Sequence, residues 1–303
     1  MLFNPNELKN DNSRGNGMIR IIDTFSEIGS LFDEGEFNQE KWEKYINNIY
    51  DNSANIFKND LKECLDGGKY IFEKDVLPII NAVYAHSELE ALHTSFCKAT
   101  DELNKKIHDR FGRELNVDIV LYVGLCNAAG WVTNINGQDV ILLGIEKILE
   151  LNWCDIDSMY GLIYHELGHV YHMQYGKSDQ KNGGSNIDFV WQLFTEGIAM
   201  YFEQSLVNDF NYYHQDKNGW LSWCESNFRQ IVRDFYNDLP TMTKYDQKYF
   251  GDWVSYNGKG DVGYYLGAKF VKQLREKYDF EYIINMNICS VYQEYVIFTR
   301  SLL

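Results

Sequence analysis

The sequence predicts an α+β fold that is mostly helical, and three observations support this prediction. Only three prolines occur among 303 residues, which favours long helices. From residue 18 to about 112, apolar residues recur at helical spacing, as in Ile21, Phe25 and Ile28. Near residue 117 this pattern gives way to continuous β-prone runs, and helical spacing returns afterwards. The order of helices, sheet and helices is typical of α+β proteins whose helices pack on the sheet.

The predicted sheet has about three strands. Two apolar runs, VDIVLYVGLC at 117–126 and DVILLGIE at 139–146, are rich in strand-forming residues. Between them, Asn136-Gly137 follows the segment WVTNI, and Asn-Gly between apolar runs is a strong hairpin signal. The segment 239–262 has no clear period, and we expect a long ordered loop there. Helices are expected at about 155–175, 188–207, 220–238 and 263–278.

The chain is expected to divide into three parts. Residues 1–17, rich in Asn and Gly, are predicted to be a flexible tail. Residues 18–115 are predicted to form an N-terminal helical region. Residues 116–303 hold the sheet, the later helices and the motifs described below, and we expect them to form the domain that performs the chemistry.

Composition excludes several classes of function. The chain has 28 Lys and Arg against 44 Asp and Glu, and its formal charge of −16 argues against nucleic-acid binding, which needs a basic face. We expect no membrane segment and no signal peptide, because no apolar run is long enough for either. The six cysteines form no CxxC pair, so we expect buried, reduced thiols and a cytoplasmic protein, with leaderless export left open. The sequence does not give the oligomeric state.

The sharpest motif is His165-Glu166-Leu167-Gly168-His169. Two histidines four residues apart on a helix lie on one face, so both imidazoles can bind one Zn²⁺ ion. A glutamate beside the first histidine is placed to deprotonate a water held on the open side of such a metal. We therefore predict His165 and His169 as zinc ligands and Glu166 as the general base.

A zinc site needs a third protein ligand, and two further residues are candidates. His172 would lie roughly 10.5 Å along the helix axis from His165, too far to share one ion. It is expected to be structural or to face the substrate. Glu196 is the better candidate, because a carboxylate in the apolar helical stretch 191–203 is costly to bury without a partner. Gly197 beside it would allow another helix to approach closely.

HELGH followed by TEGIAMYFE at 195–203 resembles the gluzincin metallopeptidases, whose zinc is held by HExxH and a glutamate on a following helix. The pattern is most similar to that of the aminopeptidase N family, and the resemblance covers roughly residues 117–280. It implies a zincin-like catalytic domain with one Zn²⁺ ion. It also implies that His165, His169 and Glu196 bind the metal and that Glu166 is the general base.

The same resemblance extends to Tyr264-Tyr265-Leu266-Gly267-Ala268. In the aminopeptidase N family, a tyrosine in such a context stabilises the oxyanion, which implies that role for Tyr264. Physically, a phenol O–H directed at the developing negative charge is a preorganised donor. Tyr265 lies about 100° further round a helix, so only one of the two should serve. Tyr265 and His214 remain alternative donors.

The segment Gly144-Ile145-Glu146-Lys147 is faintly similar to the one with which those aminopeptidases hold the substrate's amine. If Glu146, expected at the end of a strand, faces the zinc, an aminopeptidase is favoured. If it does not, an endopeptidase is equally open. A plain surface glutamate is the competing interpretation of Glu146.

The sequence thus predicts a zinc-dependent metallopeptidase that acts on peptides or proteins, with exo- or endo-action undecided. The alternative is a catalytically inactive zinc-containing or peptide-binding protein on the same scaffold. A third interpretation is a helical interaction protein in which HELGH occurs by accident.

Overall fold

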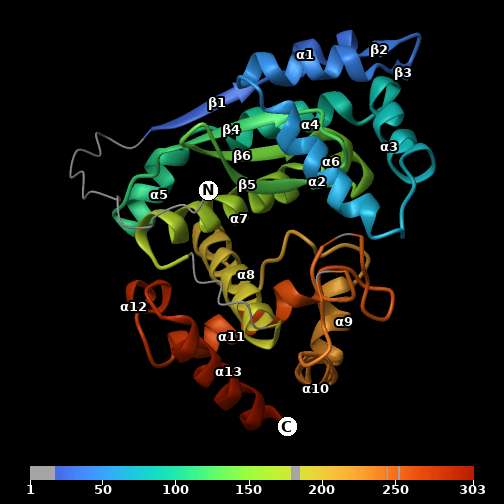
Figure 1. The fold of residues 1–303 in the computed structure, drawn as a ribbon. Helices are drawn as coiled ribbons and strands as arrows, with labels where there is room; N and C mark the ends of the chain where they lie inside the picture. Colours follow the sequence, from blue (N-terminus) through green and yellow to red (C-terminus); the bar gives the residue numbers. More distant parts are fainter. Residues whose placement is uncertain (1–17, 179–184, 244, 252) are drawn as a thin grey trace, which may run out of the picture.

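A four-stranded mixed sheet forms the centre of the upper half of the molecule in Figure 1. The computed structural model describes residues 18–178, 185–243, 245–251 and 253–303. The strand order is β1-β4-β6-β5, with β1, β4 and β6 parallel and β5 antiparallel to β6. The strands are β1 Ile19–Asp23, β4 Val117–Tyr122, β5 Gly130–Ile135 and β6 Gln138–Gly144, with a separate small hairpin of β2 Phe32–Asp33 and β3 Glu36–Phe37.

The helices form two groups in the sequence, one between β1 and β4 and one after β6, and most of the second group lies below the sheet (Figure 1). The first group is α1 Gln39–Ile49, α2 Ala54–Asp66, α3 Leu77–Ala82, α4 Leu89–Ala99 and α5 Leu103–Phe111, with short 3₁₀ or π helices at Phe25–Leu31, Phe72–Val76 and Val83–Ala85. After the sheet come α6 Ile145–Glu150, α7 Ile156–Tyr175 and α8 Ser185–Val207. The lower half holds α9 Trp220–Ser226, α10 Phe228–Asp238, α11 Val262–Arg275, α12 Phe280–Ile284 and α13 Ile288–Leu302. The predicted mostly helical α+β class is therefore confirmed.

The Asn-Gly hairpin is also confirmed. β5 and β6 pair in antiparallel register and are joined by Asn136-Gly137, whose φ angles of 54° and 87° both lie in the left-handed region. Such angles match the type I′ turn that suits the twist of a hairpin. The segment between α10 and α11 forms only two isolated bridges among its described residues, as expected for a long loop.

The helical prediction for the start of residues 18–115 is wrong. Ile19–Asp23 is a strand that pairs in parallel with β4, so the sheet has four strands rather than about three. Ile21, expected in a helical core stripe, is exposed. The hydrogen-bond partners of β1 lie almost a hundred residues away, which local periodicity cannot reveal. The buried Asp118 of β4 helps to hold this edge strand, because it pairs with Arg20 of β1 and accepts a hydrogen bond from Tyr50 at 2.5 Å.

Two smaller expectations need correction. The helix expected at 220–238 is interrupted at Asn227, which separates α9 from α10. The cysteines form no disulfide, but only three are buried, because Cys97 and Cys289 are exposed and Cys64 is half-buried.

The predicted tail, residues 1–17, lies outside the described residues. Among the described residues, no helix combines the length and apolar character needed to cross a bilayer.

The helices α7, α8 and α11 pack so closely below the sheet that a side chain larger than glycine would not fit at positions 168 and 197. A Cβ atom at Gly168 of α7 would lie 2.7 Å from the Cα atom of Ala199 on α8. A Cβ atom at Gly197 of α8 would lie 2.3 Å from the carbonyl oxygen of Gly267 on α11. Both distances are well inside van der Waals contact, so the backbones of α7, α8 and α11 meet directly.

We predict that Gly197→Ala destabilises the protein by about 1–3 kcal/mol, because the added methyl group overpacks the α8–α11 contact. The measurement is the midpoint of urea or thermal unfolding. Gly29→Ala is the matched control, since nothing lies within 4 Å of a Cβ atom there and the stability should barely change. Equal stability of the two variants would show that the helices can separate without cost.

Candidate metal centre

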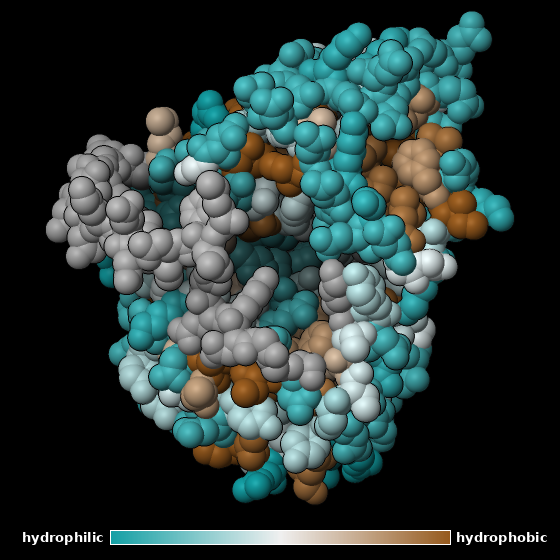
Figure 2. Space-filling view, viewed as in Figure 1, coloured by the Kyte–Doolittle hydropathy of each residue, from teal (hydrophilic) through white to brown (hydrophobic). Residues whose placement is uncertain are grey.

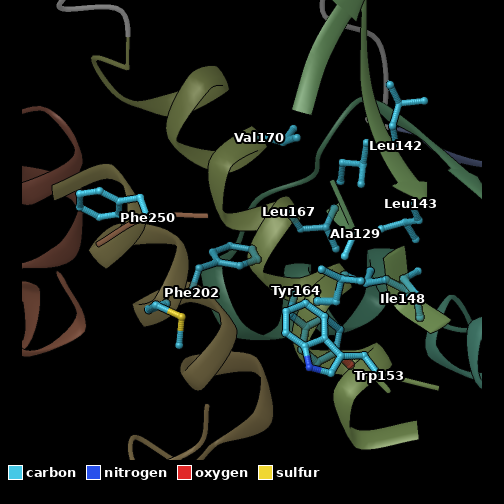
Figure 3. Close-up of a cluster of buried hydrophobic side chains, with 14 of the residues drawn as sticks. Ala129, Leu142, Leu143, Ile148, Trp153, Tyr164, Leu167, Val170, Phe202 and Phe250 are labelled. Atoms are coloured by element: carbon cyan, nitrogen blue, oxygen red, sulfur yellow. The ribbon is translucent and has the colours of Figure 1, made fainter. Parts of the chain in front are cut away.

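The HELGH motif lies in the middle of α7, a helix with defined ends. Its N-cap is Asp155, whose carboxylate accepts a hydrogen bond from the amide of Ser158 at 3.0 Å, and its C-cap is Gly176. One face of α7 is anchored in the core: Leu167 and Val170 point toward apolar side chains of the sheet, including Leu142 (Figure 3). The helix is therefore held rigidly by apolar contacts on the sheet side.

Glu196 of α8 meets both histidines of the motif. Glu196 Oε2 lies 3.1 Å from His165 Nε2 and 3.2 Å from His169 Nε2, and the two Nε2 atoms are 3.2 Å apart. The direct backbone contact between α7 and α8 near Gly168 makes this approach possible. The structure thus brings together the three residues that the sequence singled out as metal ligands.

These three atoms have the spacing of a tetrahedral metal site. Ligand atoms bound at about 2.0 Å to a tetrahedral zinc ion would be about 3.3 Å apart, which the near-equilateral triangle approaches on every side. All three ligand residues line a hollow that Glu166 and Tyr264 also line. The donor set of two imidazoles and one carboxylate suits zinc.

Behind the triangle, a second carboxylate holds two histidines. Glu203 is fully buried, and its Oε1 atom lies 3.0 Å from Nδ1 of His214 and accepts a hydrogen bond from the His214 amide at 3.3 Å. Its Oε2 atom lies 3.4 Å from Nδ1 of His165, and neither of these two atoms has a hydrogen-bond partner. A small rotation of the His165 ring toward Glu203 would bring Nδ1 and Oε2 into a hydrogen bond. Outer carboxylates of this kind fix the ring orientation of metal-binding histidines.

Sequence analysis did not identify Glu203, although a signal was present. It follows Glu196 by seven residues, which is about two helical turns, so both carboxylates lie on the same face of α8. A second acidic residue on an otherwise apolar face needs a partner in the same way as the first.

The carboxyl group of Glu166 lies in the same hollow and is almost completely buried. Burial raises its pKa to about 7, with opposing contributions from the positive charge of His169 and the negative charge of Glu196. A carboxylate with a pKa near neutrality is suited to take and return a proton.

Three buried carboxyl groups, those of Glu166, Glu196 and Glu203, meet at this site. Burial raises the pKa of Glu203 to about 7, and burial lowers the pKa of His214 to about 3, so His214 is neutral. Burial opposes ionisation of Glu196, but the charge of His169 and hydrogen bonds from both motif histidines lower its pKa to about 2. A divalent cation held by His165, His169 and Glu196 would offset the repulsion between these carboxyl groups.

Of the two adjacent tyrosines, Tyr264 faces the candidate metal centre. Its ring centroid is 5.3 Å from that of His165, and it lines the hollow beside Glu166. Tyr265 is buried on the other side of α11, with its ring centroid 5.6 Å from that of Tyr213 and its ring covered by Lys269. The structure therefore places only Tyr264 within the hollow.

Glu146 and His172 have partners of their own. Glu146 lies in the first turn of α6 rather than at the end of a strand, and its carboxylate accepts hydrogen bonds from the amides of Gly124 at 2.9 Å and Cys126 at 3.0 Å. His172 contributes to the wall of the hollow, but its Nε2 atom bonds the Ile284 carbonyl at 3.1 Å. Burial lowers the pKa of His172 to about 4, so it is neutral. Both side chains are thus held by hydrogen bonds to the backbone.

Two hollows flank the site, and Gly130, His165, Glu166 and Tyr264 line both. One, of about 430 Å³, extends toward apolar groups of Leu151 and Trp153 and toward His214. The other, of about 900 Å³, runs along β5 and past His169 and Thr195. Figure 2 shows a hydrophilic hollow between the upper and lower halves of the molecule.

A scan of the chain against protein-family models, and searches of curated proteins and of solved structures, found no match.

We predict that the affinity for zinc rises with pH between about 7 and 9. Burial lowers the pKa of His169, but the Glu196 carboxylate outweighs this and raises it to about 9 in the metal-free site. At neutral pH an incoming ion must therefore displace a proton, which costs about tenfold in affinity per pH unit below that pKa. Titration calorimetry in buffers of different ionisation enthalpy measures the released proton. An affinity that stays constant over this interval would contradict the assignment of His169.

We further predict that Glu203→Gln weakens zinc binding by roughly 10–100-fold, because it removes the charge that orients the His165 ring. Zinc affinity is measured by competition with a chromogenic chelator. Glu276→Gln, at an exposed position just beyond α11, is the control and should bind zinc as the wild type does. Unchanged affinity in Glu203→Gln would mean that Glu203 serves packing alone.

Proposed function

We propose that the protein is a zinc-dependent metallopeptidase with a ligand set of the gluzincin type. The observation that supports this most directly is the triangle of His165 Nε2, His169 Nε2 and Glu196 Oε2, with sides of 3.1–3.2 Å. The buried carboxyl group of Glu166 in the same hollow adds the group that hydrolysis requires.

In this proposal His165, His169 and Glu196 hold the zinc ion, and Glu203 orients the ring of His165. When bound, zinc supplies Lewis-acid chemistry, because it polarises a carbonyl oxygen and lowers the pKa of a water molecule. Every other step depends on side chains of the chain itself.

Glu166 moves the proton. Its carboxylate accepts a proton from the attacking water and passes it to the nitrogen of the departing amine, so one group serves as base and then as acid. Its pKa near 7 in the metal-free site follows from burial, and a nearby cation would lower it and favour the carboxylate form needed for the first step.

Tyr264 is assigned to the oxyanion. Hydrolysis of a peptide builds negative charge on the carbonyl oxygen, and a phenol O–H beside His165 can donate to it. Tyr265, packed in the core, is not in a position to do so.

The substrate in this proposal is a peptide in extended conformation. β5 is an edge strand of the sheet, and Gly130, Trp131 and Val132 line the larger hollow beside the metal ligands. An extended peptide can add to such an edge through main-chain hydrogen bonds.

Glu146 brings no carboxylate to the hollow, so an endopeptidase stays as open as an aminopeptidase. The absence of disulfides among the six described cysteines fits action in a reducing compartment such as the cytoplasm.

We predict that Glu166→Gln retains zinc but loses hydrolysis by at least ~10²–10⁴-fold, because the amide cannot accept the proton. The assay is digestion of a peptide library, with and without chelator, followed by mass spectrometry. Hydrolysis retained in this variant would remove Glu166 from its role. A wild-type protein that binds zinc but cleaves nothing would favour the alternative, a binding protein on the same scaffold.

For the oxyanion donor, Tyr264→Phe is expected to lower kcat by roughly 10²–10³-fold with little change in zinc content, since only the O–H group is lost. Tyr265→Phe is the matched control and should remain active. If the two variants lose activity equally, or if only Tyr265→Phe is impaired, the assignment to Tyr264 is wrong.

A further inference from the structure

A second cluster of metal-ligand side chains lies at the opposite edge of the sheet from β5. Asp23 ends the edge strand β1, and His93 and Cys97 lie one turn apart on α4. The ligand atoms of these three side chains lie within 4.8 Å of one another. None of these residues belongs to the candidate metal centre on α7 and α8.

The contacts of the cluster converge on one ring nitrogen. Nε2 of His93 lies 2.7 Å from Oδ2 of Asp23 and 3.5 Å from Sγ of Cys97. In a tetrahedral zinc site the nitrogen and sulfur ligands would be about 3.5 Å apart and the nitrogen and oxygen ligands about 3.3 Å apart. The sulfur already has this spacing, and the exposed carboxylate needs to move by only about half an ångström.

The cluster is held in place by its neighbours. The ring of Phe25 stacks on the ring of His93 with centroids 3.9 Å apart and planes 4° from parallel. The other carboxylate oxygen of Asp23 accepts a hydrogen bond from the Phe25 amide at 3.0 Å, which directs Oδ2 at His93. Such surrounding contacts orient metal ligands before the ion binds.

A Cys-His-Asp catalytic relay does not explain this arrangement. A relay needs the nucleophile and the carboxylate on opposite ring nitrogens, whereas both contacts here involve Nε2. Desolvation raises the pKa of the Cys97 thiol, and the charge of Asp23 raises it further, so the thiol is not an activated nucleophile. A carboxylate oxygen, an imidazole nitrogen and a thiol sulfur this close together form instead the kind of group that can bind a cation.

We propose that Asp23, His93 and Cys97 form a second site for a borderline divalent cation such as Zn²⁺, with water completing the coordination. Binding releases the Cys97 thiol proton to solvent and leaves a thiolate ligand. Because β1 and α4 each contribute ligands, the ion joins the edge strand to a helix that packs directly against α7.

Cobalt(II) titration of the purified full chain tests this site separately from the proposed catalytic one. A thiolate–cobalt bond gives an intense near-ultraviolet charge-transfer band, and the ligand set on α7 and α8 contains no sulfur. We expect the band in the wild type and in Glu196→Ala, and its loss in Cys97→Ser. Cys289→Ser removes the other exposed cysteine and is the matched control, which should keep the band.

Asp23→Asn gives an independent readout, because it keeps the sulfur but weakens the oxygen ligand. We expect the cobalt affinity of this variant, followed through the same band, to fall by at least ~10-fold. Loss of a residue that only orients a ligand already weakens metal binding by ~10–100-fold. No band in the wild type at saturating cobalt, or a band that survives Cys97→Ser, overturns the proposal. Equal affinity in Asp23→Asn and wild type also overturns it, since Asp23 would then not be a ligand.

Discussion

The direct backbone contact of α7 with α8 is the constraint on which the rest of the candidate metal centre depends. Ala199 lies against Gly168 so closely that a Cβ atom would not fit at position 168. This contact brings Glu196 to the two histidines on α7, and the contact of Gly197 with Gly267 then brings α11, and with it Tyr264, to the same hollow. Small residues at these crossings therefore set the distances between groups that come from three separate helices.

Burial of charge explains why this arrangement favours a cation. Glu166 and Glu203 are carboxylic acids in an apolar surrounding, and each has its pKa raised to about 7 by burial. The carboxyl groups of Glu166, Glu196 and Glu203 are gathered around the imidazoles of α7 at buried positions, where ionising all three is costly without a positive charge nearby. The packing of α7 against the sheet keeps its side chains from turning to solvent (Figure 3). The fold therefore keeps these carboxyl groups buried together, and a bound metal would lower the free energy of that arrangement.

Local sequence signals predicted the parts of the protein that depend on neighbours in the chain. The hairpin at Asn136-Gly137 and the helix around HELGH follow from turn chemistry and helical spacing. Glu196 was found because a charged residue in an apolar helix needs a partner. What the sequence could not reveal depends on distant contacts: β1 becomes a strand only through β4, and Glu146 is held by amides of a loop some twenty residues earlier. The joint contact of Glu203 with His165 and His214 likewise appears only once α8 is packed in place.

The central claim is that one ion is held jointly by two imidazoles of α7 and one carboxylate of α8. The most direct test is the number of zinc ions bound per chain, measured by elemental analysis after dialysis, in the wild type and in Glu196→Ala. The account predicts that the variant binds one ion fewer than the wild type while its fold, followed by circular dichroism, is kept. An unchanged zinc content in a folded Glu196→Ala protein would contradict it.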